Sequence, residues 1–315
     1  TFGYLDSYDF DGEYVTWTTD GANAGTVFYR SGKFNCTNVC GTLKAKKTNV
    51  NMKYLTVALN NEAYKHVIQV GNPKLMNNVV AKIKIPLPPV EIQEQIVAEL
   101  EGYTGIIAGT KQIVQNWKPK IDINPEWEKV KLGEVAKLMT GGTPLTSKKE
   151  YYGGDIKWLV SGDINQGEIF DCEGRITKLA LKESNARLLP RDSVLIALNG
   201  QGKTRATVAI LRTEAACNQS LVSINPEQEK LLPEFLLYVL KGKYQEIRDI
   251  NGDNQRGGLN MPIIRGIEIP LPPLDIQKQI VEKIEAERAL VESAKKLIDI
   301  YDQKTKDTLA KLWEE

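Results

Sequence analysis

The hydrophobic pattern of residues 83–101 returns at residues 267–285. The first segment reads IKIPLPPVEIQEQIVAELE and the second reads IEIPLPPLDIQKQIVEKIE, so 12 of 19 positions are identical at an offset of 184. In both segments apolar residues alternate as in a half-buried strand, and prolines then end the strand because they have no N–H for the ladder. A match of this length without gaps indicates that the chain contains two copies of one unit, each a globular part followed by a helical connector.

A long helix is predicted after each group of prolines. Apolar and small polar residues recur there in steps of three and four, which is the spacing of a coiled-coil seam. We expect the two helices to pack on each other in antiparallel fashion; the alternative is that each packs only on its own globular part. The glutamines and threonines of the seams are interpreted as devices that fix the register. The seams comprise Gln93, Ile96, Leu100, Tyr103, Ile107, Thr110, Val114 and Trp117 in the first copy, and Gln277, Ile280, Ile284, Glu287, Val291, Ala294, Ile298, Tyr301, Thr305, Thr308 and Leu312 in the second.

The two globular parts share a pattern but differ in length. Residues 13–43 and 193–224 both show a strand, a glycine-rich polar loop, a Thr-Val strand and a cysteine followed closely by asparagine. This pattern predicts an α+β fold with a mostly β core, and little helix except around residues 233–248 and their counterpart near 51–65. Because the first part is shorter, we expect that its amino-terminal portion is missing, or that the domain is naturally shortened. The predicted boundaries are 1–85 for the first domain, 86–124 for the first connector, 125–270 for the second domain and 271–315 for the second connector.

Composition excludes several classes of protein. The 315 residues carry 41 basic and 40 acidic side chains, so a nucleic-acid partner would have to be held by local patches or with the help of basic partners. A single histidine, His66, argues against histidine-based metal sites and triads. No apolar run approaches 18 residues and no targeting segment is seen, so we expect no membrane span. Four cysteines are no disulfide framework, and we expect a reducing cytoplasm.

No motif predicts catalysis. Residues 197–204, ALNGQGKT, resemble a phosphate-binding loop, but the β-branched residues that follow predict a strand rather than the helix N-terminus that holds phosphate. Cys36 and Cys40 are four residues apart and Cys172 and Cys217 are isolated, which favours core-like thiols over zinc or nucleophilic roles. No amino-methyltransferase signature or nuclease cluster is present.

Polar, glycine-rich loops recur in both globular parts. Arginine can bind guanine, and asparagine or glutamine adenine, by paired hydrogen bonds in the major groove, while lysine and hydroxyl groups hold phosphates. The alternative for each residue is an ordinary solvated turn. The candidate DNA-binding residues are Asn199, Gln201, Lys203, Thr204, Arg205, Thr143, Lys148, Asn218, Gln219 and Arg256 in the second part, and Thr19, Asp20 and Asn23 in the first.

Small residues also recur beside both seams. Gly102, Gly105 and Gly109 of the first helix align with Ala286, Ala289 and Ser293 of the second. Glycine inside a helix costs about 1 kcal/mol against alanine, so the shared small residues suggest that another helix approaches closely. The alternative is simple tolerance at exposed positions.

The two-copy plan and the IPLPPxxIQxQIV motif resemble the specificity (S) subunit of Type I restriction–modification systems. The second copy also carries landmarks similar to the family's: Trp127, Leu132-Gly133-Glu134, Gly141-Gly142-Thr143-Pro144, Gly154-Asp155-Ile156-Lys157-Trp158, Gly200–Arg205 and Asn218-Gln219. The resemblance covers essentially the whole chain, apart from the shortened first domain.

The resemblance implies a recognition subunit without catalytic activity of its own. Two target-recognition domains would each read half of a bipartite site in double-stranded DNA. The two helices would set the spacing and dock two methyltransferase (M) subunits, to which restriction/motor (R) subunits join. The resemblance implies that this chain binds no cofactor, and that S-adenosylmethionine, ATP and Mg are bound by the partner subunits. It also implies a location in the cytoplasm. Two alternatives remain: a specificity subunit of a fused restriction enzyme, and a scaffold protein that binds no DNA.

Overall fold

The structure is a computed structural model that describes residues 3–69, 71–200, 202, 204–250 and 258–314. The chain divides into two compact units. Unit 1 comprises Thr1–Asn116 with Val291–Glu315, and unit 2 comprises Trp117–Leu290. The carboxyl-terminal half of the last helix therefore belongs with the first globular part.

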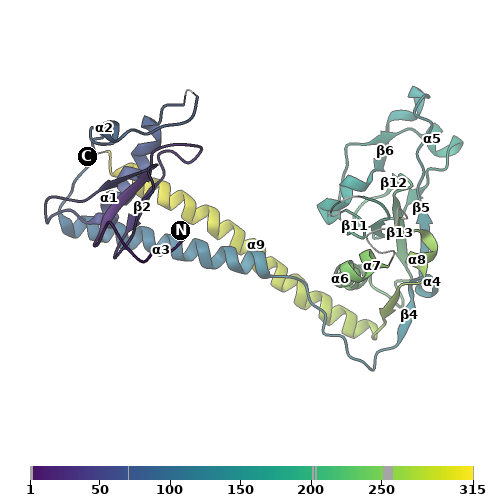
Figure 1. Ribbon diagram of the computed structural model, residues 1–315. Helices are drawn as coiled ribbons and strands as arrows, with labels where there is room; N and C mark the ends of the chain where they lie inside the picture. The colour runs from purple at the N-terminus through teal and green to yellow at the C-terminus, as the bar shows by residue number, and fades with distance from the viewer. Residues whose placement is uncertain (1–2, 70, 201, 203, 251–257, 315) are drawn as a thin grey trace. The chain divides into compact units, whose positions relative to one another are not determined.

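Unit 1 is built on a three-stranded antiparallel sheet with the order β2-β1-β3 (Figure 1). The helix α1 packs on this sheet, with Leu55 and Leu59 in one core with Trp17 of β1. Asn51 caps the start of α1, because its side chain accepts from two N–H groups of the first turn. The elements are β1 (Tyr14–Thr18), β2 (Val27–Arg30), β3 (Cys40–Leu43), α1 (Met52–Ala63), the 3-10 turn η1 (Tyr64–His66), α2 (Asn77–Val80), α3 (Val90–Asn116) and the part of α9 (Leu274–Lys311) from Val291 onward.

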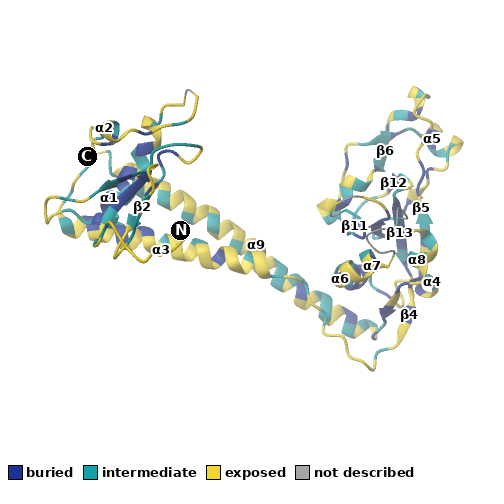
Figure 2. Cartoon of the chain, in the orientation of Figure 1, coloured by how far each residue is buried: buried dark blue, intermediate teal, exposed yellow. Residues whose placement is uncertain are grey.

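The two long helices α3 and α9 pack on each other in unit 1. The rings of Tyr103 and Tyr301 lie 5.3 Å apart, and Ile96 packs in the same cluster as Leu312, so the helices run antiparallel. All predicted seam residues of α3 are buried or half-buried, whereas Figure 2 shows most of the helix surface exposed. The predicted seam residues of α9 are likewise buried or half-buried. The prediction of a packed antiparallel helix pair is confirmed.

The interpretation of the seam glutamines as register devices of the helix pair is wrong for Gln93. Its side chain is fully buried, but it faces the globular part of unit 1 and not α9. The amide nitrogen donates to the carbonyls of Asn49 and Pro88, and the amide oxygen accepts from the Asn51 N–H at 2.8 Å. Gln93 therefore fixes α3 to the loop that begins α1.

Unit 2 contains two larger sheets. One has the order β5-β13-β10-β11-β7, the other has the order β8-β6-β12-β9, and β14 pairs with β4. The core of the first sheet joins Phe235 and Leu236 of α6 to Ile196 and Val208 of the sheet. The strands are β4 (Lys129–Lys131), β5 (Ala136–Thr140), β6 (Tyr152–Leu159), β7 (Glu168–Ile169), β8 (Arg175–Ile176), β9 (Leu188–Leu189), β10 (Val194–Ala197), β11 (Val208–Leu211), β12 (Ala215–Cys217), β13 (Leu221–Pro226) and β14 (Glu268–Pro270). The helices are α4 (Leu132–Val135), α5 (Lys178–Glu183), α6 (Pro233–Gly242), α7 (Tyr244–Asp249), α8 (Met261–Arg265) and the first part of α9, with the 3-10 segments η2 (Lys149–Tyr151) and η3 (Ser161–Gln166).

One motif is common to both units. The strand order β2-β1-β3 of unit 1 recurs as β11-β10-β13 in unit 2, with antiparallel pairing throughout. A helix follows the third strand in each case, α1 in unit 1 and α6 in unit 2, and packs on the sheet. The predicted α+β class, with helix near residues 51–65 and 233–248, is confirmed.

Candidate nucleic-acid interface

Three predicted loops of unit 2 meet at one edge of its five-stranded sheet. Because neighbouring strands run antiparallel, β5 and β10 end where β13 and β11 begin. The Gly142 N–H donates to the Cys217 carbonyl and the Leu198 N–H donates to the Ser220 carbonyl, each at 2.9 Å. We call residues 141–143, 198–200, 204–207 and 218–220 the polar edge of unit 2.

Thr143 and Gln219 are in direct contact on this edge. The Thr143 hydroxyl donates to the Gln219 amide oxygen at 2.6 Å, and both residues are exposed. Glycine is required beneath them, since a Cβ added to Gly141 would lie 1.8 Å from the Cys217 carbonyl oxygen. Asn218 is half-buried and its side chain accepts from the Ser220 N–H, which shapes the turn. Gln219 is thus an exposed amide whose oxygen is held by the Thr143 hydroxyl group.

The loop between β10 and β11 carries Asn199 and Thr204. Asn199 is exposed and Thr204 is half-exposed, and Gly200 has a φ of 135°, which favours glycine. Gly258 lies against Asn199, because a Cβ added there would be 1.8 Å from the Asn199 amide oxygen. The loop leads into the strand β11 and not into a helix, as the sequence predicted. Of the predicted residues, Gln201, Lys203 and Arg256 lie outside the described part of the chain.

Arg205 is engaged within unit 2. Its terminal nitrogen donates to the Arg248 carbonyl at 2.8 Å, near the end of α7, and its Nε is buried with no hydrogen-bond partner. The Arg248 side chain in turn donates to the Arg205 carbonyl at 3.4 Å. Arg205 therefore fixes the β10–β11 loop to α7, a role that the sequence did not indicate.

Lys148 is paired with neighbours from two elements. Its ammonium group donates to the Tyr151 hydroxyl at 2.7 Å and lies 3.5 Å from the Glu183 carboxylate of α5. The hydrogen bond to Tyr151, with Glu183 nearby, raises the pKa of Lys148 above its usual value. Sequence reasoning missed Glu183, which is far from Lys148 along the chain.

Unit 1 has an equivalent edge where β1 ends and β3 begins. We call residues 19–26 and Val39 the polar edge of unit 1. The Thr19 N–H donates to the Val39 carbonyl at 3.0 Å. The Thr19 hydroxyl donates to the Asp20 carboxylate at 2.7 Å, and Lys74 lies 3.3 Å from that carboxylate. The hydroxyl and then the ammonium group lower the pKa of Asp20. Asn23 is exposed at the tip of the β1–β2 loop.

The described candidate residues leave little free positive charge. Of the two cations among them, Lys148 faces a carboxylate and Arg205 binds a carbonyl, so the groups exposed on both edges are mainly amides and hydroxyls. Such groups can distinguish bases but attract phosphate weakly.

The glycine face of α3 points away from the helix pair. Gly102, Gly105 and Gly109 are exposed, and a Cβ added to any of them would meet nothing within 4 Å. Ile106 and Ile113 lie on the same face and are 37% and 58% exposed. At 3.6 residues per turn this face is about 110° from the seam. We call these five residues the docking face of α3.

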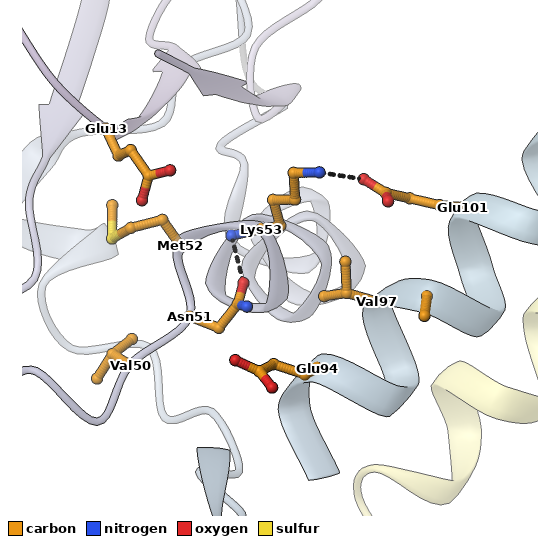
Figure 3. Close-up of a pocket in the computed structure, with 9 residues that line it drawn as sticks. Glu13, Val50, Asn51, Met52, Lys53, Glu94, Val97 and Glu101 are labelled. Carbon is orange, nitrogen blue, oxygen red and sulfur yellow. Dashed lines mark hydrogen bonds and ion pairs between the residues drawn. The ribbon is translucent and has the colours of Figure 1, made fainter. Parts of the chain in front are cut away.

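A pocket of about 380 Å³ lies between the loop before α1 and the start of α3. Figure 3 shows Lys53 in an ion pair with Glu101, with Glu13 and Glu94 also on the wall. Three carboxylates against one ammonium group make this pocket unsuitable for phosphate or nucleic acid.

A sequence model of the family described as "Type I restriction modification DNA specificity domain" matches residues 1–116 and 124–299. The chain belongs to this family. The match includes both copies of the PLPP motif, the whole of α3 and α9 as far as residue 299, and it agrees with the resemblance seen in that motif.

The chain is similar to a putative type I specificity subunit of Mycoplasma pneumoniae, with 37% identity over 163 residues that cover 47% of this chain and 45% of that subunit. It spans less than half the length of this and further such relatives. Among solved structures, the S subunit of a Type-I restriction-modification system from M. genitalium matches with a TM-score of 0.56 at 14% identity, over 100% of this chain and 86% of the other. The HsdS subunit from Thermoanaerobacter tengcongensis matches with a TM-score of 0.54 at 19% identity, over 95% and 80%. At these identities the structures show a shared fold.

No helix in the described part of the chain is both long and apolar enough to span a bilayer. No group of three histidines, cysteines or acids that could hold a metal ion occurs among the residues that the structure describes.

Proposed function

We propose that this chain acts as the DNA sequence-specificity subunit of a Type I restriction–modification complex, working in the cytoplasm. The observation that carries the proposal is the repeated three-stranded motif, which presents a polar edge in each unit of a chain that belongs to the specificity family. Each edge would read one half of a bipartite site in double-stranded DNA.

The polar edge of unit 2 supplies groups suited to direct readout. The amide of Gln219, oriented by Thr143, can pair with the two hydrogen-bonding atoms of adenine in the major groove. Asn199 offers a second amide on the same edge. The absence of a side chain at Gly141 lets the backbone before Thr143 pack against Cys217, which holds Thr143 beside Gln219 on this edge.

The partners in this proposal are two methyltransferase (M) subunits, joined by restriction/motor (R) subunits. The net charge of +1 supports this, because a subunit that read DNA alone would need more phosphate contacts than its own charge provides. The docking face of α3 is suited to a partner helix, since glycines permit close approach and Ile106 and Ile113 offer apolar surface. On α9, Ser293 and Leu297 are the repeat equivalents of Gly109 and Ile113 and are also exposed.

The chain itself would do no chemistry. We infer that it binds none of the cofactors, and that S-adenosylmethionine, ATP and Mg are bound by the M and R subunits, which methylate adenine and cleave DNA. What this chain contributes is the position of the partners on the DNA.

The test is to map methylated bases after co-expression of this chain with its methyltransferase subunit. We expect one bipartite motif with a fixed gap. Gln219→Ala should relax the motif at one or two base pairs of one half-site, at a cost of about 1–3 kcal/mol for each lost base contact. Gln228→Ala is the matched control, because Gln228 is exposed beyond the opposite end of β13 and should leave the motif unchanged.

Three results would contradict the proposal or redirect it. Assembly of the complex without any methylated motif favours the scaffold alternative. Methylation by a single fused partner that also cleaves DNA favours the fused restriction enzyme. If Gln219→Ala leaves the methylated motif unchanged, Gln219 does not contact the bases of the site.

A further inference from the structure

Two thiol groups of unit 1 lie in contact just beyond its polar edge. The Cys40 Sγ donates to the Cys36 Sγ at 3.3 Å, and both side chains are half-buried. The other two cysteines, Cys172 and Cys217, are buried in unit 2. Cys36 and Cys40 are thus a pair whose sulfur atoms are already adjacent and reachable from solvent.

The backbone between the two thiols is folded into a turn. The Cys40 N–H donates to the Thr37 carbonyl at 3.2 Å, which brings residues four apart in sequence close together. A disulfide has sulfur atoms about 2.05 Å apart, so the pair would have to close by little more than about 1 Å, which side-chain rotation can provide. Among the described residues no third cysteine, histidine or acid completes a metal site with them, which favours disulfide chemistry over metal binding.

We propose that Cys36 and Cys40 form a reversible dithiol–disulfide site that closes in the presence of a low-molecular-weight disulfide such as oxidised glutathione. This site is separate from the docking face and does not depend on DNA recognition.

The reaction proceeds by two thiol–disulfide exchanges. Burial, together with the neighbouring Cys40 thiol, raises the pKa of Cys36 to about 12 and so makes Cys36 a poor attacking group. In the proposed reaction Cys40 makes the first attack. The Cys40 thiolate bonds to one sulfur of oxidised glutathione and releases one glutathione thiolate. Cys36 then loses its proton to that thiolate, attacks the Cys40 sulfur and releases the second glutathione. The protein loses two electrons and two protons, and oxidised glutathione gains them as two thiols.

Closure would act on the polar edge of unit 1 through the backbone. Val39 lies between the two cysteines and its carbonyl accepts from the Thr19 N–H, while Cys40 is paired with Thr18 in the β1–β3 ladder. A covalent link across this turn reduces the number of open states available to it. We therefore expect the Thr19 amide to exchange its hydrogen more slowly in the oxidised chain.

The site is tested on the full chain under native conditions. The protein is incubated with millimolar oxidised glutathione, alkylated and digested with trypsin, which releases residues 34–44 with both cysteines. We expect this peptide to be about 2 Da lighter than its reduced form and unalkylated, and to regain two alkylation sites after dithiothreitol. Hydrogen exchange at Thr19 is measured on the same two samples.

Two variants and one internal control complete the test. Cys40→Ser should abolish closure, whereas Cys172→Ala should retain it. Cys172 and Cys217 of the unchanged chain should stay reduced until the protein is unfolded, because both are buried. Two alkylated cysteines in peptide 34–44 after oxidation would overturn the proposal. Closure without slower exchange at Thr19 would overturn the link to the polar edge.

Discussion

Gln93 and Gln277 occupy equivalent positions of the repeat, 184 residues apart, and make the same three hydrogen bonds in their own units. Each is fully buried. Gln277 donates to the carbonyls of Lys230 and Pro272, both at 2.8 Å, and accepts from the Leu232 N–H at 2.9 Å. Each glutamine thus joins its long helix to the proline segment and to the N-cap residue of a shorter, earlier helix, α1 in unit 1 and α6 in unit 2.

We predict that Gln277→Ala destabilises unit 2 strongly. The substitution leaves two carbonyls and one N–H, in a buried to partly buried place, without a partner, so the free energy of unfolding should fall by about 2–4 kcal/mol. Denaturant unfolding of the full chain measures the change. Gln303→Ala is the control, because Gln303 is exposed on the same helix and should change stability by less than about 0.5 kcal/mol.

The isosteric variant Gln277→Glu separates hydrogen bonding from packing. At neutral pH its carboxylate would face the Lys230 and Pro272 carbonyls, so we expect destabilisation at least as great as with alanine. Wild-type stability in Gln277→Glu would mean that the buried amide contributes shape alone.

A second prediction concerns Glu168, which joins the sheet of unit 2 to the first part of α9. Arg288 donates to it at 2.9 Å and Arg212 lies 3.1 Å away. Burial raises the pKa of Glu168, but the hydrogen bonds from the two arginines outweigh this and lower the pKa below its ordinary value of 4.5. A carboxyl group whose pKa is lowered on folding stabilises the protein above its unfolded pKa, and this stability is lost as the pH falls through the folded pKa.

Glu168→Gln should therefore remove part of the acid sensitivity. We expect the variant to have a free energy of unfolding about 1 kcal/mol below that of wild type at pH 7, and this difference to shrink as the pH falls below 4.5 and through the lowered pKa of Glu168. Urea unfolding across pH 3–7 measures this. Glu173→Gln is the control, because Glu173 is exposed, and its free energy of unfolding should change with pH as that of wild type does. A constant difference between Glu168→Gln and wild type would contradict the assigned role.

A third prediction follows from the contact between Arg205 and the Arg248 carbonyl. Arg205→Ala should lower the free energy of unfolding by about 1–2 kcal/mol, because a partly buried carbonyl loses a charged donor. Arg248→Ala should lower the free energy of unfolding by less, since this variant keeps the backbone carbonyl that Arg205 binds. If Arg205 also contacts DNA, its alanine variant will change the methylated motif as well; an unchanged motif would restrict Arg205 to a structural role.

The sequence predicted what depends on periodicity and on local turns. The seam residues Tyr103 and Tyr301 follow from steps of three and four, and their rings do meet. The pairing of Thr143 with Gln219 could not be predicted, because it depends on β5 lying beside β13, a long-range arrangement that hydrophobic pattern does not specify. The roles of Gln93 and Arg205 were missed for the same reason, since their partners are backbone groups and a backbone carbonyl has no sequence signature.

The docking face of α3 gives a prediction in which stability and binding change in opposite directions. Gly109→Ala adds a methyl group that meets nothing within 4 Å in the free chain, so the helix should gain about 1 kcal/mol of stability. If a partner helix packs closely on this face, the same methyl group would stand in its way, and the affinity for the methyltransferase subunit should fall several-fold. Calorimetry measures the first effect and titration with the purified partner measures the second. Lys111→Ala is the control, because Lys111 lies on the opposite face of α3 and its replacement should leave the affinity for the methyltransferase subunit unchanged. Unaltered affinity in Gly109→Ala would mean that partners bind elsewhere, and that the glycines persist only because an exposed helix tolerates them.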